Sequence, residues 1–265
     1  SGLWSKGILR EWIINFVIRD VKPMKYAIIL AAGKGTRMKT DIPKCAYPIN
    51  GTPMVEYIVN SCKKSGIDKI LVVVGYKKEH IKNILNSSVE YVLQEEQLGT
   101  ANAVMCAKAS LADKEGISLI LPGDMPLINE KVITDLMNCH QEQGNVLTIA
   151  TTILDDPDGY GRIYREHGKI KKIVEALDAT PEILEIKEIN SGLYCVDIKL
   201  LFEALAKVNN NNSKKEYYLT DIVEILAKDH KVGTFVVADS KYLLGINDLN
   251  SLQKVEEILK YQSEF

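Results

Sequence analysis

The sequence has no long hydrophobic run, no excess of charge of one sign and no clustered pairs of histidine or cysteine. Its 33 Lys and Arg residues nearly balance 35 Asp and Glu residues, and the net charge of -2 gives no sign of a nucleic-acid partner. No apolar stretch is long enough to cross a bilayer, so no transmembrane segment is predicted. The 265 residues are 46% hydrophobic and 26% charged, which is typical of a globular protein with a substantial core.

Cysteine and histidine are too scattered for a disulfide framework or a zinc site. No two cysteines have C-x-x-C spacing, and most lie in apolar runs, which indicates reduced thiols in a cytoplasmic protein. Any bound metal ion must therefore be held by oxygen atoms. The five cysteines are Cys45, Cys62, Cys106, Cys139 and Cys195.

Residues 1–23 differ from the rest of the chain. Apolar side chains recur there at spacings of three and four, which predicts an amphipathic helix. The segment lacks the order of a signal peptide, and Met24 opens a strand-like run that suits a natural protein start. We therefore interpret 1–23 as a leader ahead of one domain over residues 24–265, with an interfacial membrane helix as the alternative.

Beyond the leader, strand-like and helical stretches alternate. This pattern predicts an α/β fold with a Rossmann-like, mostly parallel sheet and helices on both faces. Thr52 and Pro53 are expected to begin the first helix and Gly66 to end it. The predicted strands cover residues 26–31, 70–74, 89–93, 117–121 and 146–153.

The alternation of strands and helices is interrupted after the fifth predicted strand. Two short apolar and basic runs, 161–165 and 169–174, flank His167 and Gly168 and predict an antiparallel hairpin inserted beside the parallel sheet. Helices over residues 219–228 and 249–261 are expected to close the chain.

A glycine-rich turn directly follows the first predicted strand. Its sequence, LAAGKGTRM over residues 30–38, lets backbone N–H groups approach phosphate oxygens, while Lys34, Arg37 and the later Lys44 supply positive charge. The turn is neither a Walker loop nor the G-x-G-x-x-G dinucleotide motif, since Met38 occupies the third glycine position. It predicts a phosphate-binding loop of another kind.

Together with later motifs, this loop resembles the signature of sugar-phosphate nucleotidylyltransferases. The order and spacing are most similar to the uridyltransferase half of bacterial bifunctional N-acetylglucosamine-1-phosphate uridyltransferases and acetyltransferases. The resemblance covers residues 25–261. The motifs are PK (43–44), QEEQLGTA (94–101), PGD (122–124), GYGRI (159–163), VE (174–175), NSG (190–192), EYYLTD (216–221) and GIN (245–247).

The resemblance implies an enzyme that transfers UMP from UTP to N-acetylglucosamine 1-phosphate, giving UDP-N-acetylglucosamine, a cell wall precursor, and pyrophosphate. UTP and a sugar 1-phosphate are then its small-molecule partners. The acceptor is already an anion, so no catalytic triad is expected. Catalysis depends on neutralising and aligning phosphates, which Mg²⁺ suits.

The resemblance also implies a role for each site residue. Arg37, Lys44 and Asp124 are the expected catalytic residues, and Asp124 and Asn247 hold the metal. The expected nucleotide and base contacts are Leu30, Ala31, Ala32, Gly33, Gln94, Gln97, Gly99, Thr100 and Gly123. The expected sugar contacts are Gly161, Glu175 and Asn190.

Departures from the family pattern leave alternatives open. No hexapeptide repeats follow, so acetyl transfer is not predicted and a monomer or weak oligomer is expected. Cys45 and Ser191 differ from the family's common residues, and Asp248 adds a possible carboxylate beside the metal site. A nucleotidylyltransferase for another sugar phosphate or nucleotide, or a non-catalytic nucleotide-sugar-binding paralogue, remains an alternative.

Overall fold

A computed structural model describes residues 23–35, 38 and 41–263. All but the last residue of the expected leader, and the expected catalytic Arg37, lie outside the described residues. Within the described part, no helix combines the length and apolar character needed to cross a membrane.

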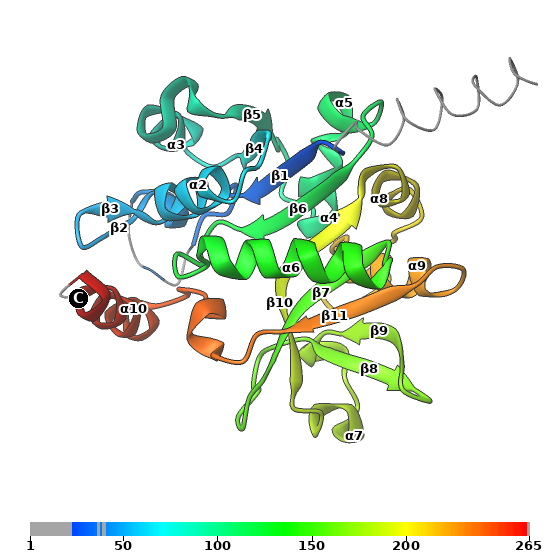
Figure 1. The fold of residues 1–265 in the computed structure, drawn as a ribbon. Helices are drawn as coiled ribbons and strands as arrows, with labels where there is room; N and C mark the ends of the chain where they lie inside the picture. Colours follow the sequence, from blue (N-terminus) through cyan, green and yellow to red (C-terminus); the bar gives the residue numbers. More distant parts are fainter. Residues whose placement is uncertain (1–22, 36–37, 39–40, 264–265) are drawn as a thin grey trace, which may run out of the picture.

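A twisted sheet runs through the centre of the molecule (Figure 1). Its main strands lie in the order β11-β7-β10-β6-β1-β4-β5, and all neighbouring pairs are parallel except those that β10 makes with β6 and β7. The predicted mostly parallel α/β fold is therefore confirmed. The bounds are β1 (Lys25–Leu30), β4 (Lys69–Val74), β5 (Glu90–Leu93), β6 (Ile117–Pro122), β7 (Leu147–Ile153), β10 (Glu188–Asp197) and β11 (Val232–Val236).

Helices cover both faces of this sheet because its strands are apolar on both faces. Along β1, Tyr26 and Ile28 join one buried cluster while Ala27 and Ile29 join the other. The first cluster lies under α4 (Thr100–Met105), α8 (Ile198–Leu205) and α9 (Asp221–Ala227). The second lies under α2 (Met54–Lys64), α3 (Lys78–Leu85) and α6 (Glu130–Gln143).

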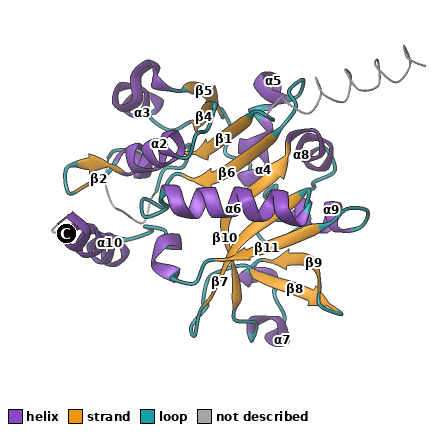
Figure 2. Cartoon of the chain, viewed as in Figure 1, coloured by secondary structure: helices purple, strands orange, loops and turns teal. Residues whose placement is uncertain are grey.

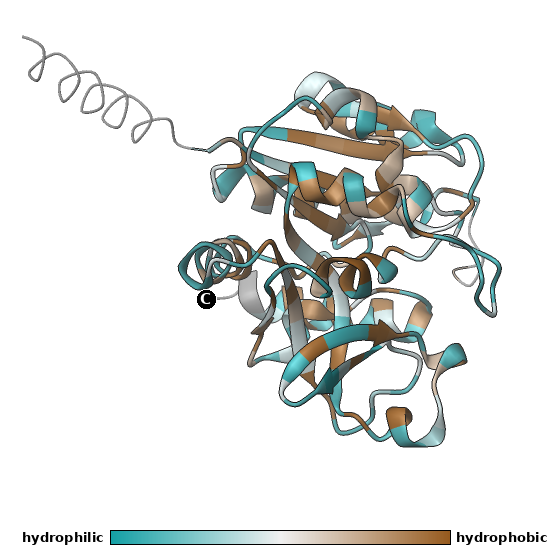
Figure 3. Ribbon diagram, turned by 90° about the vertical axis from the view of Figure 1, so that its right-hand side faces the viewer, coloured by the Kyte–Doolittle hydropathy of each residue, from teal (hydrophilic) through white to brown (hydrophobic). Residues whose placement is uncertain are grey.

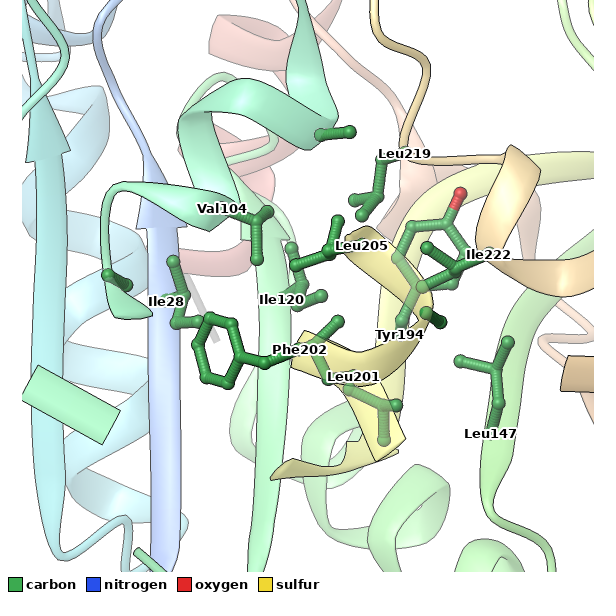
Figure 4. Close-up of a cluster of buried hydrophobic side chains, with 14 of the residues drawn as sticks. Ile28, Val104, Ile120, Leu147, Tyr194, Leu201, Phe202, Leu205, Leu219 and Ile222 are labelled. Carbon is green, nitrogen blue, oxygen red and sulfur yellow. The ribbon is translucent and has the colours of Figure 1, made fainter. Parts of the chain in front are cut away.

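Figure 4 shows side chains of the first cluster, in which residues of α4 and α8 pack side by side against Ile28 of β1 and Ile120 of β6. Figure 3 shows the resulting hydropathy pattern, with apolar strands inside and polar helix surfaces outside.

The hairpin expected beside the sheet is present as β8 (Arg162–Glu166) and β9 (Lys169–Val174). His167 and Gly168 form the turn with φ of 49° and 77°, the positive values of a type I′ connection. The hairpin joins the sheet through the pairing of Arg162 with Ile189 of β10. It therefore borders the sheet at the strand that separates β6 from β7.

Two strands of the main sheet, β10 and β11, were not predicted from the sequence. β10 contains Asn190, Ser191 and Gly192, which locally favour a turn, and its pairing with β7 is irregular between Asn190 and Tyr194. β11 is half-exposed, so it lacks the continuous apolar run of the inner strands. Both form because tertiary pairing overrides weak local preference.

The expected start of the first helix, with Thr52 as the cap and Pro53 as the first helical residue, was wrong by one residue. Thr52 and Pro53 form β3, which pairs with β2 (Pro48–Ile49) across a turn at Asn50 and Gly51, and α2 begins at Met54 with Pro53 as its N-cap. Gly66 has a φ of 71° just beyond the helix, so its predicted role at the C-terminal end is confirmed.

The last helix, α10 (Leu249–Ser263), packs beside the β2-β3 hairpin and away from the main sheet (Figure 2). A third buried cluster joins them through Ile49, Met54, Ile246, Leu252 and Val255. This packing brings the residues just before α10 toward the end of β6.

Short elements complete the part of the chain that the structure describes, and all five cysteines are free thiols. These elements are η2 (Lys44–Ala46), η3 (Asn86–Ser88), α5 (Lys108–Leu111), η4 (Ala176–Asp178), α7 (Pro181–Leu184) and η5 (Ser240–Leu243).

Candidate active site

A cavity of about 450 Å³ lies at the carboxyl ends of β1 and β6, the edge where open α/β sheets bind ligands. Residues from distant parts of the chain line it. They are Leu30, Gly33, Gly35, Lys44, Cys45, Thr100, Pro122, Gly123, Asp124, Glu175, Asn190, Gly192, Tyr194, Leu219, Thr220 and Asn247.

One lysine holds two oxygen atoms together at one side of this cavity. The Lys44 ammonium donates to Asp124 Oδ2 at 2.5 Å and to Asn247 Oδ1 at 2.7 Å. The Lys44 and Asp124 side chains are only 13% and 24% exposed, so each charge needs a close partner. The Ile246 N–H donates to the Asp124 carbonyl at 2.9 Å, which fixes the segment carrying Asn247 against the end of β6.

Close backbone packing surrounds this cluster. The Gly123 N–H donates to the Leu30 carbonyl at 2.9 Å, and a Cβ on Gly123 would lie 2.6 Å from that oxygen and 2.8 Å from Cys45 Sγ. Only glycine therefore allows the glycine-rich turn after β1 and the turn that carries Asp124 to approach so closely. Burial and the charge of Asp124 raise the pKa of Cys45 to about 12, so this thiol remains protonated at neutral pH.

The cavity is also lined by a partly buried carboxyl group, that of Glu175. Thr220 Oγ1 donates to Glu175 Oε1 at 3.1 Å, and burial raises the pKa of Glu175 above its ordinary value. The Asn190 N–H donates to the Gly161 carbonyl at 2.9 Å, which ties the hairpin to β10. A Cβ on Gly161 would meet Ile173 Cγ2 at 2.9 Å, so a side chain there would displace the strand that leads to Glu175.

The expected base-reading residues lie around an adjoining hollow. Gln94 and Gln97 line this second pocket, together with Lys34 and Tyr76. Gln94 is 5% exposed, and its Nε2 donates to Asn102 Oδ1 at 2.8 Å. Gln97 Nε2 donates to the Ala32 carbonyl, which joins the segment after β5 to the glycine-rich turn.

Gly99 and Thr100 follow Gln97 in the chain, and Thr100 lines the main cavity. Gly99 has a φ of 121°, and a Cβ there would lie 2.5 Å from the Tyr217 carbonyl oxygen. Thr100 Oγ1 accepts the Leu219 N–H at 2.9 Å. The segment after Gln94 is thus bonded to the segment that carries Thr220.

Most of the predicted site residues converge. Leu30, Gly33, Lys44, Thr100, Gly123, Asp124, Glu175, Asn190 and Asn247 line the main cavity. Ala31 and Ala32 are buried behind it, Gln94 and Gln97 line the adjoining pocket, and Gly99 and Gly161 support the walls.

Among the lining residues to which the sequence analysis gave no role, two carry hydroxyl groups, Tyr194 and Thr220. Tyr194 is 1% exposed at the floor, where burial and the charge of Glu175 raise its pKa and a hydrogen bond with Asn190 opposes that rise. Thr220 lies in the EYYLTD motif, which was noticed without any role being assigned to Thr220. No local signal marked Tyr194.

The oxygen atoms of Asp124 and Asn247 fit a hard divalent cation. Both already converge on one cationic atom, Lys44 Nζ. Within the described residues, no group of three or more His, Cys, Asp or Glu side chains could hold a metal. A cation here would therefore take one carboxylate and one amide oxygen from the protein and further oxygens from phosphates or water, as Mg²⁺ does at phosphate-transfer sites. The Asp248 carboxylate accepts hydrogen bonds from Ser251 at the start of α10.

Comparison with known proteins gives a consistent result. Residues 26–260 match the nucleotidyl transferase family. The chain is 48% identical over 236 residues to bifunctional protein GlmU of Acholeplasma laidlawii, covering 89% of this chain and 51% of that protein. It is 50% identical over 236 residues to bifunctional protein GlmU of Acetivibrio thermocellus, covering 88% and 51%. The chain therefore spans about half the length of the curated relatives it matches.

A solved structure shares the fold. UDP-glucose pyrophosphorylase complexed with UDP-glucose aligns with a TM-score of 0.70 over 90% of this chain and 99% of that chain, at 20% sequence identity. At this level of identity, the likeness concerns the fold alone.

Proposed function

Because the chain belongs to the nucleotidyl transferase family, we propose that it transfers UMP from UTP to N-acetylglucosamine 1-phosphate, releasing pyrophosphate and forming UDP-N-acetylglucosamine. The similarity to bifunctional GlmU proteins supports this reaction. The observation that carries the proposal is that Lys44, Asp124 and Asn247 share one cavity with Glu175 and Asn190. A phosphate-binding cluster and a polar pocket for a sugar thus face the same space.

The proposed reaction is an in-line displacement. A phosphate oxygen of the sugar phosphate attacks the α-phosphorus of UTP and forms a new P–O bond. The bond from that phosphorus to the bridging oxygen breaks, and its electron pair leaves with pyrophosphate. The attacking oxygen is already ionised, so the site needs no general base.

The residues of the chain act mainly through charge and position. The Lys44 ammonium neutralises the phosphates at the reacting centre, and Arg37 binds the triphosphate and the departing pyrophosphate. Mg²⁺ held by Asp124 and Asn247 would neutralise further phosphate charge when bound. Leu30, Gly33 and Gly123 line the cavity around the phosphates, with Ala31 and Ala32 behind them.

Two separate groups of residues select the substrates, one for the base of the nucleotide and one for the sugar. Gln94, Gln97, Gly99 and Thr100 bind the uracil edge, for which amide groups offer both donors and acceptors. Glu175 and Asn190, supported by Gly161, bind the N-acetyl sugar.

Four further features belong to the same proposal. The transferase domain covers residues 24–265, after the leader. It acts in the cytoplasm on small molecules, as a monomer or weak oligomer. Light scattering of the purified chain tests the last point.

The decisive experiment is a pyrophosphate-release assay. Four nucleoside triphosphates are combined with the 1-phosphates of N-acetylglucosamine, glucose and galactose, and kcat/KM is measured for each pair. The highest value is expected for UTP with N-acetylglucosamine 1-phosphate. A preference for another pair would assign the sister reaction, and no release with any pair would leave a nucleotide-sugar-binding protein.

A further inference from the structure

The Lys44 side chain stands where a metal ion would have to bind. Its Nζ lies 2.5 Å from Asp124 Oδ2 and 2.7 Å from Asn247 Oδ1, which are the two protein oxygens that fit a divalent cation. Mg²⁺ binds oxygen at roughly 2.0–2.1 Å, so it would occupy nearly the same point. The ammonium and the metal cannot both hold these oxygens, because two cations at such a separation repel each other strongly.

Burial explains why the ammonium lies there. An Asp124 carboxylate that is 24% exposed and lacks a nearby cation would carry an uncompensated charge. The Lys44 ammonium lies 2.5 Å from this carboxylate and supplies the compensating positive charge, and the Lys44 side chain is only 13% exposed. The site therefore neutralises itself with its own cation when no metal is bound.

The position of the Lys44 side chain gives the ammonium a second possible partner, the phosphates of a bound nucleotide. A Cβ on Gly35 would collide with Lys44 Cβ, so the glycine-rich turn lies directly against this side chain. Phosphates bound at that turn would lie beside Lys44, and their oxygens would accept hydrogen bonds from its ammonium group. Lys44 is thus shared between the metal oxygens and the nucleotide.

We propose that Lys44 is an internal cation that occupies the metal position of the free protein and must leave Asp124 and Asn247 before a divalent cation binds there. This inference rests on the proposed function in that it takes these two oxygens as the metal site. It makes metal binding and nucleotide binding mutually supportive, because each favours the same displacement of the ammonium.

The first test measures Mn²⁺ binding by electron paramagnetic resonance, without substrates. Lys44→Met is expected to bind Mn²⁺ at least 10-fold more tightly than the wild type, since the competing ammonium is gone. Lys69→Met, which removes a lysine paired with Glu90 at 2.5 Å, is the matched control for loss of charge and should leave Mn²⁺ affinity unchanged. Lys44→Met combined with Asp124→Asn should lose the tight binding. Unchanged or weaker binding by Lys44→Met, or tight binding that persists without Asp124, overturns the proposal.

The second test uses the wild-type protein and so does not depend on the folding of a variant. Amine labelling with acetic anhydride is followed by mass spectrometry, with and without Mn²⁺. Labelling of Lys44 is expected to rise several-fold with Mn²⁺ while that of Lys69 stays constant, and an unchanged or lower Lys44 rate contradicts the displacement. Neither test requires turnover, so a failed pyrophosphate assay would leave their outcome intact.

Discussion

The Ser251 hydroxyl oxygen accepts the backbone N–H of Asn247 at 2.9 Å, and it also accepts that of Asp248 at 3.1 Å. In return, the Ser251 N–H donates to Asp248 Oδ1 at 2.8 Å. This reciprocal arrangement is a capping box that fixes the start of α10. The residue that holds one of the two oxygens around Lys44 is therefore oriented by a helix cap.

Ser251→Ala should loosen Asn247 without touching the cavity. Two backbone N–H groups lose their acceptor, so we expect a loss of about 1 kcal/mol in the free energy of unfolding. We also expect a several-fold higher Mg²⁺ concentration for half-maximal activity.

Ser251→Thr keeps the hydroxyl and should restore the Mg²⁺ dependence. Ser65→Ala removes another helix-end hydroxyl, which donates to the Ser61 carbonyl at 2.7 Å, and serves as the control. An Mg²⁺ titration that does not distinguish Ser251→Ala from Ser65→Ala would remove the positioning role.

Asp124→Asn should nearly abolish turnover while the fold persists. The change keeps the shape of the side chain but removes the charge, and a loss of about 10²-fold or more in kcat is expected from the loss of charge stabilisation at the phosphates. Asp135→Asn, on the surface of α6 beside Lys131, is the matched control and should retain full activity. EDTA should abolish wild-type activity reversibly, and near-normal kcat in Asp124→Asn would refute the role of this carboxylate.

Arg37 lies outside the described residues, and its role follows from the motif alone. Arg37→Ala should lower kcat by about 10²-fold, the scale of losing one electrostatic stabiliser. Arg37→Lys should recover only part of this, because a point charge replaces a bidentate fork. Steady-state kinetics separates the possibilities, since a change confined to KM would indicate binding without catalysis.

Gly123→Ala should lower both the stability and the activity of the protein. The added Cβ would lie 2.6 Å from the Leu30 carbonyl oxygen, so the turn that carries Asp124 must shift. We expect a loss of about 1–3 kcal/mol in the free energy of unfolding, as for overpacked sites. Gly33→Ala is the control, because a Cβ there meets nothing within 4 Å. Urea unfolding of the two variants should differ clearly, and equal stabilities would contradict the close packing.

Asp221 should make stability depend on pH. Burial, with the charges of Glu224, Glu175 and Asp178, raises its pKa to about 6. A carboxyl group that binds its proton more tightly when folded lowers the free energy of unfolding as the pH rises from about 4 to about 6.

Asp221→Asn removes this penalty, so its Tm should exceed that of the wild type at pH 8 and match it near pH 4. Because Asp221 is half-exposed, the gain is expected to be about 1 kcal/mol. The exposed Asp229 provides the control Asp229→Asn, and scanning calorimetry at both pH values measures the effect. A Tm gain of the same size at pH 4 would argue against titration of Asp221.

The inner strands could be predicted from the sequence because β1 and β4 are apolar on both faces and end at turns that contain glycine. β10 could not, since Asn190, Ser191 and Gly192 have the local preference of a loop, and this part of the strand forms beside β7, where Asn190 pairs with Thr151. The convergence of Lys44, Asp124 and Asn247 joins residues up to 203 positions apart, which no local pattern encodes. Ordered motifs suggested those residues, whereas the ammonium bridge between the two oxygens required the fold.

Strand β10 also determines the order in which the sheet can close. During synthesis from the N-terminus, β1, β4, β5 and β6 are complete while β10, the partner of β6 on its other side, has not yet been made. Until then β6 presents an open edge, and such edges favour pairing with the wrong strand or with another chain. A nascent chain that has not reached Asp197 therefore has Asp124 beside an unprotected edge, and this interval is when the protein is most exposed to aggregation and to chaperones.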